Sequence, residues 1–286
     1  MSLPQPPSQA PQIPACYRHP DREGWRSCTR CGRPACSDCL VQASVGSQCV
    51  DCAKAGRPDA KTRAVRWNAG QPTLITFVLI GINVAVFAWI SLADPNSLGG
   101  RGGITRQQFD LGLNKALLGF THEWYRLVTA GFLHFGFMHL AFNMFMLYQL
   151  GQLLERSLGR AQFVLLYGAS LLAGSFGVLI LDSAGISGGA SGAVFGLLAA
   201  AAIGMHRRGV NVFSTGIGTT LLLNLFITFA IPGISIGGHL GGAVGGAVCG
   251  YVMLAPKWRS FPTWALWFAP VAVAVVSVAG SIIIVG

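Results

Sequence analysis

The sequence has few charged side chains. Asp, Glu, Lys and Arg account for only 10% of its 286 residues, and 52% of the residues are hydrophobic. Because a soluble globular chain carries about a quarter charged residues, this composition argues against a soluble enzyme. It argues equally against a disordered chain, which needs low hydrophobicity and high net charge. We therefore expect a membrane protein.

Acidic residues are the scarcer of the two charged classes, with 10 Asp and Glu against 20 Lys and Arg and a net charge of +10. In a membrane protein such an excess indicates first a bias of the cytosolic loops toward Lys and Arg. The basic residues are spread among several loops, and no groove lined by aromatic residues is visible. Nucleic-acid binding is therefore not expected.

Apolar runs long enough to cross a bilayer as helices follow one another along the chain. They predict an all-α polytopic membrane protein with seven spans, over roughly 73–93, 137–154, 161–181, 190–205, 212–231, 237–254 and 263–285.

The charges of the short loops orient these spans. The loops at 182–189 and 232–236 contain no Lys or Arg, whereas the alternate short loops each contain a basic pair: Arg156 with Arg160, Arg207 with Arg208, and Lys257 with Arg259. The positive-inside rule then places the N-terminal region in the cytosol and the C-terminus outside. The long segment 94–136 also lies outside, and its mixture of apolar and charged residues predicts a structure in the membrane interface.

Seven of the eight cysteines lie between Cys16 and Cys52, and Cys249 stands alone in an apolar run. With one histidine, the seven form four pairs of residues three positions apart: Cys16 and His19, Cys28 and Cys31, Cys36 and Cys39, and Cys49 and Cys52. Four such pairs supply two tetrahedral metal sites, and a disulfide framework does not require this repeat. The pattern predicts two structural zinc ions with no ligand position left open for catalysis.

The spacing resembles that of B-box-type zinc fingers over residues 15–53, although the final pair is Cys-Cys where that family usually carries histidine. The resemblance implies a cross-brace, in which the first and third pairs bind one zinc and the second and fourth bind the other. Sequential pairing remains the alternative. Thiolate ligands need a reducing compartment, so we expect this domain in the cytosol. There it is a candidate site for a cytosolic protein partner, or it serves only to fold a small domain.

Composition divides the rest of the N-terminal region. Residues 1–14 are rich in proline and lack periodicity, which predicts a disordered tail, and residues 54–72 are polar and basic, which predicts a linker. Neither segment resembles a cleavable signal peptide, since the apolar runs begin too far along the chain.

Unusual polar residues gather at the starts of three spans that run inward from the outer face. His139 and Asn143 lie near the start of the second span, Ser191 at the start of the fourth, and His239 at the start of the sixth. Ionisable side chains within a bilayer are costly and point to a functional site. A serine hydroxyl needs a base to become a nucleophile, and His239 is the available base. His139 and Asn143 share one helix face and can direct donors at the same oxygen.

The same pattern predicts a Ser-His dyad rather than a triad, because no acidic residue lies near this level in the three spans. Asp182, at the outer end of the third span, is a less favoured group for orienting His239. Glycines recur every four residues in the fourth and sixth spans, which lets two helix backbones approach closely. Ser187 also lies in a Gly-x-Ser-Gly sequence, but within a glycine-rich loop, so Ser191 is the favoured nucleophile.

On these residues the chain from 73 to 260 resembles the rhomboid intramembrane serine proteases. The shared features are Trp124-Tyr125-Arg126; His134, His139 and Asn143; Glu155, Arg156 and Gly159; Gly189, Ser191 and Gly192; and Gly238, His239, Gly241 and Gly245. The resemblance implies a six-helix core over 73–260 and one additional C-terminal transmembrane helix over 261–286. It also implies hydrolysis of transmembrane substrates near the outer membrane face.

The resemblance gives each site residue a role. Ser191 becomes the nucleophile and His239 the general base, and the oxyanion hole is formed by His139, Asn143, Gly189 and the Ser191 N–H. Phe195 stands where family members often have tyrosine against the catalytic histidine, so ring stacking is retained without the phenolic hydrogen bond.

We therefore expect an intramembrane serine endopeptidase that cuts transmembrane segments of membrane proteins through an acyl-enzyme, without a catalytic cofactor, in a bacterial plasma membrane. A non-catalytic rhomboid-fold chaperone or client-binding protein is the alternative, and the presence of both Ser191 and His239 argues against it. A third hypothesis, in which the zinc finger acts and the helices only anchor it, leaves the intramembrane histidines unexplained.

Overall fold

The structure is a computed structural model that describes residues 13–59, 62–63, 67, 70, 72–99, 103–182 and 185–286. The chain divides into two compact units, residues 1–66 and 67–286, and each is considered by itself. Most of the predicted disordered tail (residues 1–12) and several positions of the predicted linker lie outside the described residues.

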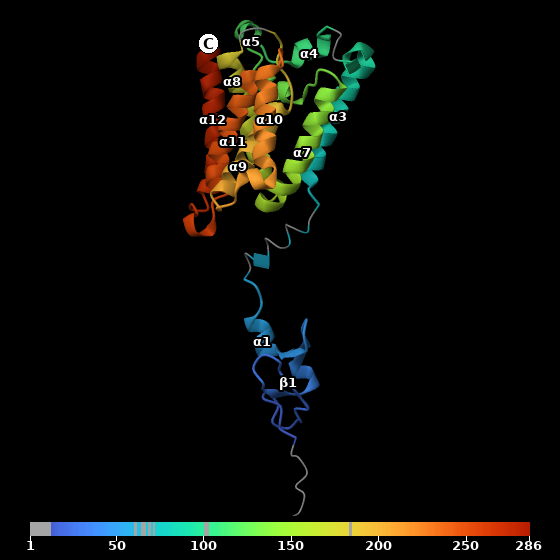
Figure 1. The fold of residues 1–286 in the computed structure, drawn as a ribbon, viewed down its shortest axis with the longest axis vertical. Helices are drawn as coiled ribbons and strands as arrows, with labels where there is room; N and C mark the ends of the chain where they lie inside the picture. The colour runs from blue at the N-terminus through green and yellow to red at the C-terminus, as the bar shows by residue number, and fades with distance from the viewer. Residues whose placement is uncertain are drawn as a thin grey trace, which may run out of the picture. The chain divides into compact units, whose positions relative to one another are not determined.

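Two small antiparallel sheets and two short helices form the described part of the first unit (Figure 1). They are β1 (Arg26–Ser27) with β2 (Pro34–Ala35), β3 (Leu40–Gln42) with β4 (Ser47–Cys49), η1 (Ser37–Cys39) and α1 (Val50–Ala55). Glycine occupies the reversal in each hairpin, where φ is 73° at Gly32 and 68° at Gly46. The buried cluster of this unit consists mainly of cysteines, so cysteine side chains stand where a larger domain has an apolar core.

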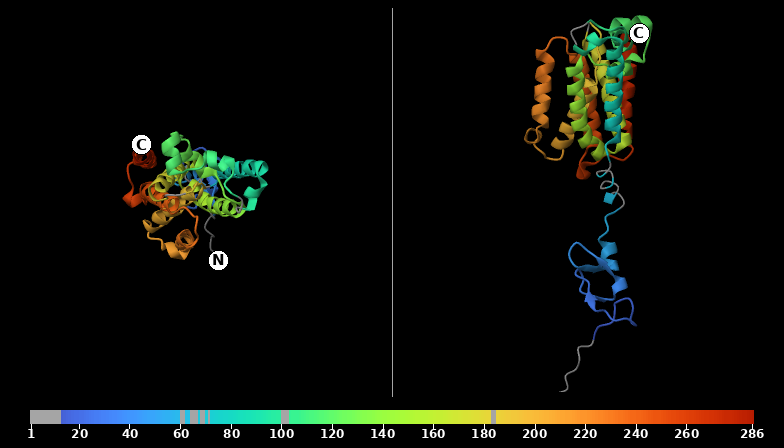
Figure 2. Two further views of the ribbon diagram at one scale, coloured as in Figure 1. Left: turned by 90° about the horizontal axis from the view of Figure 1, so that it is seen from above. Right: turned by 90° about the vertical axis from the view of Figure 1, so that its right-hand side faces the viewer.

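In the described part of the second unit, seven long helices lie at the positions of the predicted spans (Figures 1 and 2). They are α3 (Leu74–Ala93), α7 (Phe137–Leu158), α8 (Arg160–Leu181), α9 (Ser191–His206), α10 (Ile217–Ala230), α11 (Ile236–Met253) and α12 (Ala265–Val285). The all-α architecture is therefore confirmed. The span expected from residue 212 begins at Ile217 instead, because η4 (Val212–Thr215) ends at Gly216, where φ is 78°.

Four of these helices, α3, α8, α11 and α12, are long and apolar enough to cross a membrane, as judged over the described residues. A fifth candidate is the pair formed by Arg126–Phe132 and α7, which is bent by 96°. α9 and α10 are shorter apolar helices. These helices make the chain an integral membrane protein.

The segment between α3 and α7 is folded, as its mixed composition predicted. Its elements are η2 (Pro95–Gly99), α4 (Arg106–Leu111), α5 (Lys115–Thr121), α6 (Arg126–Thr129) and η3 (Ala130–Phe132). The buried guanidinium of Arg126 donates to the carbonyl oxygens of Phe109 at 2.6 Å and Gly112 at 2.9 Å, and it pairs with Glu123. Because a buried charge needs such partners, Arg126 anchors this segment.

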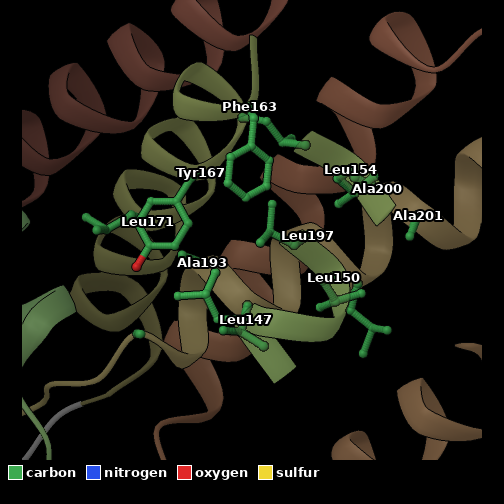
Figure 3. Close-up of a cluster of buried hydrophobic side chains, with 14 of the residues drawn as sticks. Leu147, Leu150, Leu154, Phe163, Tyr167, Leu171, Ala193, Leu197, Ala200 and Ala201 are labelled. Atoms are coloured by element: carbon green, nitrogen blue, oxygen red, sulfur yellow. The ribbon is translucent and has the colours of Figure 1, made fainter. Parts of the chain in front are cut away.

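The core of the second unit surrounds α9. Every residue from Ala193 to Ala201 is buried, as expected for a helix that is apolar on all sides. Figure 3 shows the contact among three helices, with Leu197 of α9 between Phe163 of α8 and Leu150 of α7.

α11 packs against α8 and α9 through glycine backbones. A Cβ added to Gly242 would overlap the backbone of Gly192, and one added to Gly246 would overlap that of Gly196. The close helix approach predicted from the glycine spacing is therefore present. It brings the first turn of α11 against the first turn of α9.

Glu155 joins the end of α7 to the start of α3. Its carboxylate accepts hydrogen bonds from the N–H of Ile75 at 3.0 Å, from the N–H of Thr76 at 2.8 Å and from the Thr76 hydroxyl at 2.6 Å. N–H groups in the first turn of a helix lack partners within that helix. Glu155 therefore caps α3 and links it to α7.

Candidate active site and metal sites

Ser191 is the first residue of α9 and follows a glycine-rich turn in which Gly189 has a φ of 142°. Its side chain is half-buried. At a helix start the backbone N–H groups are unpaired within the helix and carry its positive dipole end. Ser187 lies instead in a loop, where its backbone exchanges two hydrogen bonds with Leu113, at 2.8 and 2.9 Å.

His239 lies in the first turn of α11 and is 8% exposed. Its ring stacks on that of Phe195, with centroids 4.1 Å apart and planes inclined by 16°. Phe195 follows Ser191 by one turn of α9, so the imidazole lies over the beginning of the serine helix. Among the described residues, no hydrogen bond joins Ser191 to His239.

Glycines of three helices meet beside this pair. A Cβ on Gly192 of α9 would lie 3.1 Å from the Gly238 carbonyl oxygen, and one on Gly174 of α8 would lie 3.0 Å from it. Larger residues at these positions would push α9 and α8 away from α11. The local sequence thus positions both Ser191 and His239 through backbone packing.

His139 presents a ring nitrogen to the turn before Ser191. Its Nδ1 accepts the N–H of Phe135 at 3.3 Å, which leaves the proton of the neutral ring on Nε2. A Cβ on Gly189 would lie 3.0 Å from that Nε2 and 3.5 Å from Ser191 Oγ. The Nε2–H therefore faces the space beside the serine hydroxyl.

Asn143 and Gly189 have other partners. Asn143 Nδ2 donates to the His139 carbonyl oxygen of its own helix at 2.9 Å, which leaves its second amide hydrogen. The Gly189 N–H donates to the Ala130 carbonyl oxygen at 2.8 Å. This N–H is consequently not available to an oxyanion, and what Gly189 provides is a turn without a side chain.

Asp182 caps α11 rather than orienting His239. Its carboxylate accepts hydrogen bonds from the Ser235 hydroxyl and from the Gly237 N–H, the latter at 3.1 Å. The group that does contact His239 was not among the predicted site residues. His239 Nδ1 lies 2.7 Å from Thr228 Oγ1 of α10, a hydroxyl within an apolar run.

His134 is fully buried and contacts His139, with ring centroids 5.0 Å apart. Its carbonyl oxygen accepts Gln108 Nε2 at 3.1 Å. Neither of its ring nitrogens has a hydrogen-bond partner within the described parts of the chain. His134 thus connects the interhelical segment to α7 without reaching Ser191.

A cavity of about 40 Å³ lies beside Ser191. Residues of α8, α9 and α11 and of the turns before α9 and α11 line it, among them Ser175, Gly189 and Ser235. Since a water molecule takes up about 30 Å³ in the liquid, the cavity has room for water next to the serine.

In the first unit, the first and third Cys/His pairs meet in one cluster. The ligand atoms of Cys16, His19, Cys36 and Cys39 lie within 4.8 Å of one another. His19 Nδ1 lies 3.9, 3.5 and 3.3 Å from the three sulfur atoms, in that order along the chain. Tetrahedral zinc separates its ligand atoms by about 3.5 to 3.8 Å, so this cluster fits a zinc ion.

The second and fourth pairs meet in the other cluster, formed by Cys28, Cys31, Cys49 and Cys52. The Sγ atoms of Cys31 and Cys49 are 3.8 Å apart, again the separation of zinc ligands. Arg33 Nε lies 3.3 Å from Cys31 Sγ. Four thiolates around a divalent cation leave a net negative charge, which this guanidinium partly neutralises. The pairs alternate between the two clusters, as in a cross-brace.

The thiols of this second cluster differ in proton affinity. The backbone N–H of Cys49 lowers the pKa of Cys28 to about 6, whereas hydrogen bonding to the Cys49 side chain raises the pKa of Cys52 to about 12. All eight cysteines, each among the described residues, are free thiols. A set of thiolates beside protonated thiols releases protons when a metal binds. Both clusters are compatible with structural zinc.

Comparison with known proteins bears on the helical unit. Residues 121–256 match the Rhomboid domain family. The chain is 32% identical over 206 residues to the rhomboid protease GluP of Bacillus subtilis (strain 168), covering 70% of this chain and 39% of that protein. It is 43% identical over 76 residues to the putative rhomboid protease YdcA of the same organism, covering 26% of this chain and 38% of the relative. It is 37% identical over 139 residues to RHOMBOID-like protein 5 of Arabidopsis thaliana, covering 46% and 45%.

The chain thus spans less than half the length of each of these relatives. The matched domain lies within the helical unit and contains Ser191, His239 and His139. It leaves out the metal-ligand clusters. The helical unit thus contains a Rhomboid domain, the domain of a family whose members are commonly intramembrane serine proteases.

Proposed function

We propose that this protein is an intramembrane serine endopeptidase in which Ser191 is the nucleophile and His239 the general base. The observation that carries the proposal is the stacking of His239 on Phe195, one turn beyond Ser191, at 4.1 Å. This contact puts an imidazole and a helix-start serine at the same end of two closely packed helices. The relationship to the protease GluP supports the same activity.

The reaction follows from these groups. Ser191 Oγ attacks the carbonyl carbon of a peptide bond while its proton passes to His239 Nε2. The C–N bond then breaks, and the proton moves from Nε2 to the leaving amine, which leaves an acyl-enzyme. Water attacks the ester with His239 again as base, and Ser191 regains its proton. The cavity beside Ser191 has room for that water.

The negative oxygen of the tetrahedral intermediate needs donors already in place. His139 Nε2–H supplies one, because Nδ1 accepts the Phe135 N–H. The Ser191 N–H supplies another at the positive end of α9. Asn143 is a third candidate through its second amide hydrogen, whereas the Gly189 N–H is engaged with Ala130.

The substrate is a transmembrane segment of another membrane protein. Its helix must unwind locally before a carbonyl can be attacked, which favours small or helix-breaking residues near the cut. The loop charges support an orientation with the active site near the outer face of a bacterial plasma membrane and the C-terminus outside.

In the same proposal, the two Cys/His clusters each hold one zinc ion with a structural role. Such an ion supplies the stability that so small a core lacks. The thiolate ligands favour a cytosolic location, where this unit could bind a protein partner. No step of the proposed hydrolysis involves these ions.

One observation favours a second candidate, a non-catalytic client-binding protein. Within the described residues, Ser191 makes no hydrogen bond to His239, so the serine of this structure is not activated. The two candidates differ in whether the serine is chemically reactive. A serine-directed fluorophosphonate measures that property without any substrate.

The test uses the full chain in detergent or liposomes. The parent protein should be labelled at Ser191, as located by mass spectrometry, and should cleave a test transmembrane substrate. Ser191→Ala should abolish labelling, and both Ser191→Ala and His239→Ala should lower cleavage by about a thousandfold or more. Ser187→Ala is the matched control and should behave as the parent. Cleavage by Ser191→Ala at the parental rate would refute the assignment. A parent that binds substrate but is neither labelled nor active would establish the client-binding alternative.

A further inference from the structure

α10 contributes little to the core of the bundle. All of its residues are described, and only Gly218 and Thr228 are buried. In Figure 2 the helix stands at the edge of the bundle. Thr228, at 1% exposure, is nevertheless among the most buried polar residues of the chain. A buried hydroxyl on a helix whose other residues, apart from Gly218, are half-buried or exposed needs a reason, because an unpaired hydroxyl is costly away from water.

The Thr228 hydroxyl has two partners. Its Oγ1 lies 2.7 Å from His239 Nδ1 and donates to the carbonyl oxygen of Asn224 at 2.7 Å. A hydroxyl has a single proton to donate. Because that proton is donated to the Asn224 carbonyl oxygen, Oγ1 can only accept a hydrogen bond from the ring. The contact with His239 is then Nδ1–H···Oγ1.

The direction of this hydrogen bond fixes the tautomer of His239. A neutral imidazole with its proton on Nδ1 has its lone pair on Nε2, which is the nitrogen that must take the serine proton. The opposite tautomer would carry its proton on Nε2 and could not act as a base. Hydrogen bonding to Nδ1–H also holds the ring in the plane stacked on Phe195.

A carboxylate performs this role in a Ser-His-Asp triad. Here the nearby acid, Asp182, is engaged by Ser235 and Gly237 at the start of α11. A neutral hydroxyl can orient the ring, but it stabilises the imidazolium less than a carboxylate does. Thr228 is therefore suited to orienting the His239 ring rather than to stabilising its positive charge.

We infer that Thr228 is a positioning residue, which holds His239 in the Nδ1–H tautomer and thereby makes the base depend on the placement of α10. This inference rests on the proposed protease function. Asn224 supports it from one turn earlier, since its carbonyl oxygen accepts the hydrogen bond of the hydroxyl and its own Nδ2 donates to the backbone carbonyl oxygen of Thr220 at 2.8 Å.

The kinetic test uses the full chain and one transmembrane substrate. Thr228→Val keeps the shape of the side chain but removes the hydroxyl, and it should lower kcat about tenfold with KM unchanged, the worth of one hydrogen bond. Thr228→Ser should retain most of the parental kcat. The matched control is Thr220→Val, the same change two turns earlier on α10, which should leave kcat unchanged. Equal losses in Thr228→Val and Thr220→Val, or an unchanged kcat in Thr228→Val, would overturn the inference.

A second measurement separates this inference from the proposed function. The ¹⁵N chemical shifts of the His239 ring, in chain labelled at histidine, report which nitrogen carries the proton. The parent and Thr228→Ser should show a protonated Nδ1, and Thr228→Val should show a mixture of tautomers. If the parent is inactive but shows a protonated Nδ1, the protease proposal fails while the hydrogen bond stands. If the parent shows a protonated Nε2, the inference fails whatever the activity.

Discussion

The two units of this chain obtain their structures by opposite means. In the unit of residues 1–66, the buried core is small and includes Cys16, Cys36 and Cys39. The eight Cys and His ligand atoms of this unit gather in two metal-ligand clusters. In the helical unit, cohesion comes from close packing around α9, with glycine backbones in contact. The fold of the first unit depends on a few metal-ligand side chains, whereas the packing of the second depends on glycines, which have no side chain. The comparison shows which substitutions each unit can survive.

The largest effect is expected in the metal-ligand unit. Cys49→Ser removes a fully buried ligand and should release one zinc per chain and unfold this unit, because structural zinc contributes about 10 kcal/mol or more to such small folds. Zinc content by elemental analysis and proteolysis of the N-terminal region measure the result. Cys249→Ala, which removes a cysteine from α11, should leave the zinc content unchanged. Retention of both ions by Cys49→Ser would show that this cluster is not a zinc site.

An intermediate effect is expected where glycine backbones meet. Gly242→Ala puts a Cβ into the backbone of Gly192, so α9 and α11 must separate, at a cost of about 3 kcal/mol. Denaturant unfolding in mixed micelles measures the loss. Gly168→Ala makes the same change in α8, where nothing lies within 4 Å of the added Cβ, and should be neutral or stabilising. If both variants unfold alike, close backbone packing is not what holds the helices.

The smallest of the three effects concerns the cap between α7 and α3. Glu155→Gln replaces a carboxylate that accepts three hydrogen bonds and should destabilise the helical unit by about 2 kcal/mol. The same unfolding assay applies, and zinc content should not change. Ser157→Ala, an exposed position two residues further along α7, provides the baseline. A loss no larger than this baseline would mean that water replaces Glu155 at the start of α3.

Much of this architecture could be predicted because long apolar runs have one stable outcome in a bilayer. The helices begin within a few residues of the predicted positions, except where Gly216 ends η4 and delays α10. The residues around Ser191 and His239 were accessible for a similar reason. Polar groups in an apolar run are costly, so their positions stand out in the sequence.

The remaining contacts depend on how helices lie against one another, which periodicity does not encode. Thr228 precedes His239 by 11 residues, and nothing in its apolar run shows that α10 turns this hydroxyl toward the imidazole. The sequence placed Asp182 at the outer end of the third span, but it did not show that the carboxylate bonds to Ser235 and not to His239. The hydrogen bond from the Gly189 N–H to the Ala130 carbonyl oxygen likewise depends on how the segment between α3 and α7 folds. Pairwise geometry of this kind follows only from the packed structure.

The last helix changes which parts of the protein meet lipid. α12 covers one side of α8, with Gly280 beside Phe176, while α9 and α11 pack against its other sides. In the most apolar stretch of α8, 61% of the residues are buried, against 17% in that of α12. α8 is consequently an interior helix of the bundle and not a peripheral one. Bilayer thickness and lipid composition therefore act directly on α3, α10 and α12, whose residues are mostly not buried, and they act on α8 through the helices that cover it.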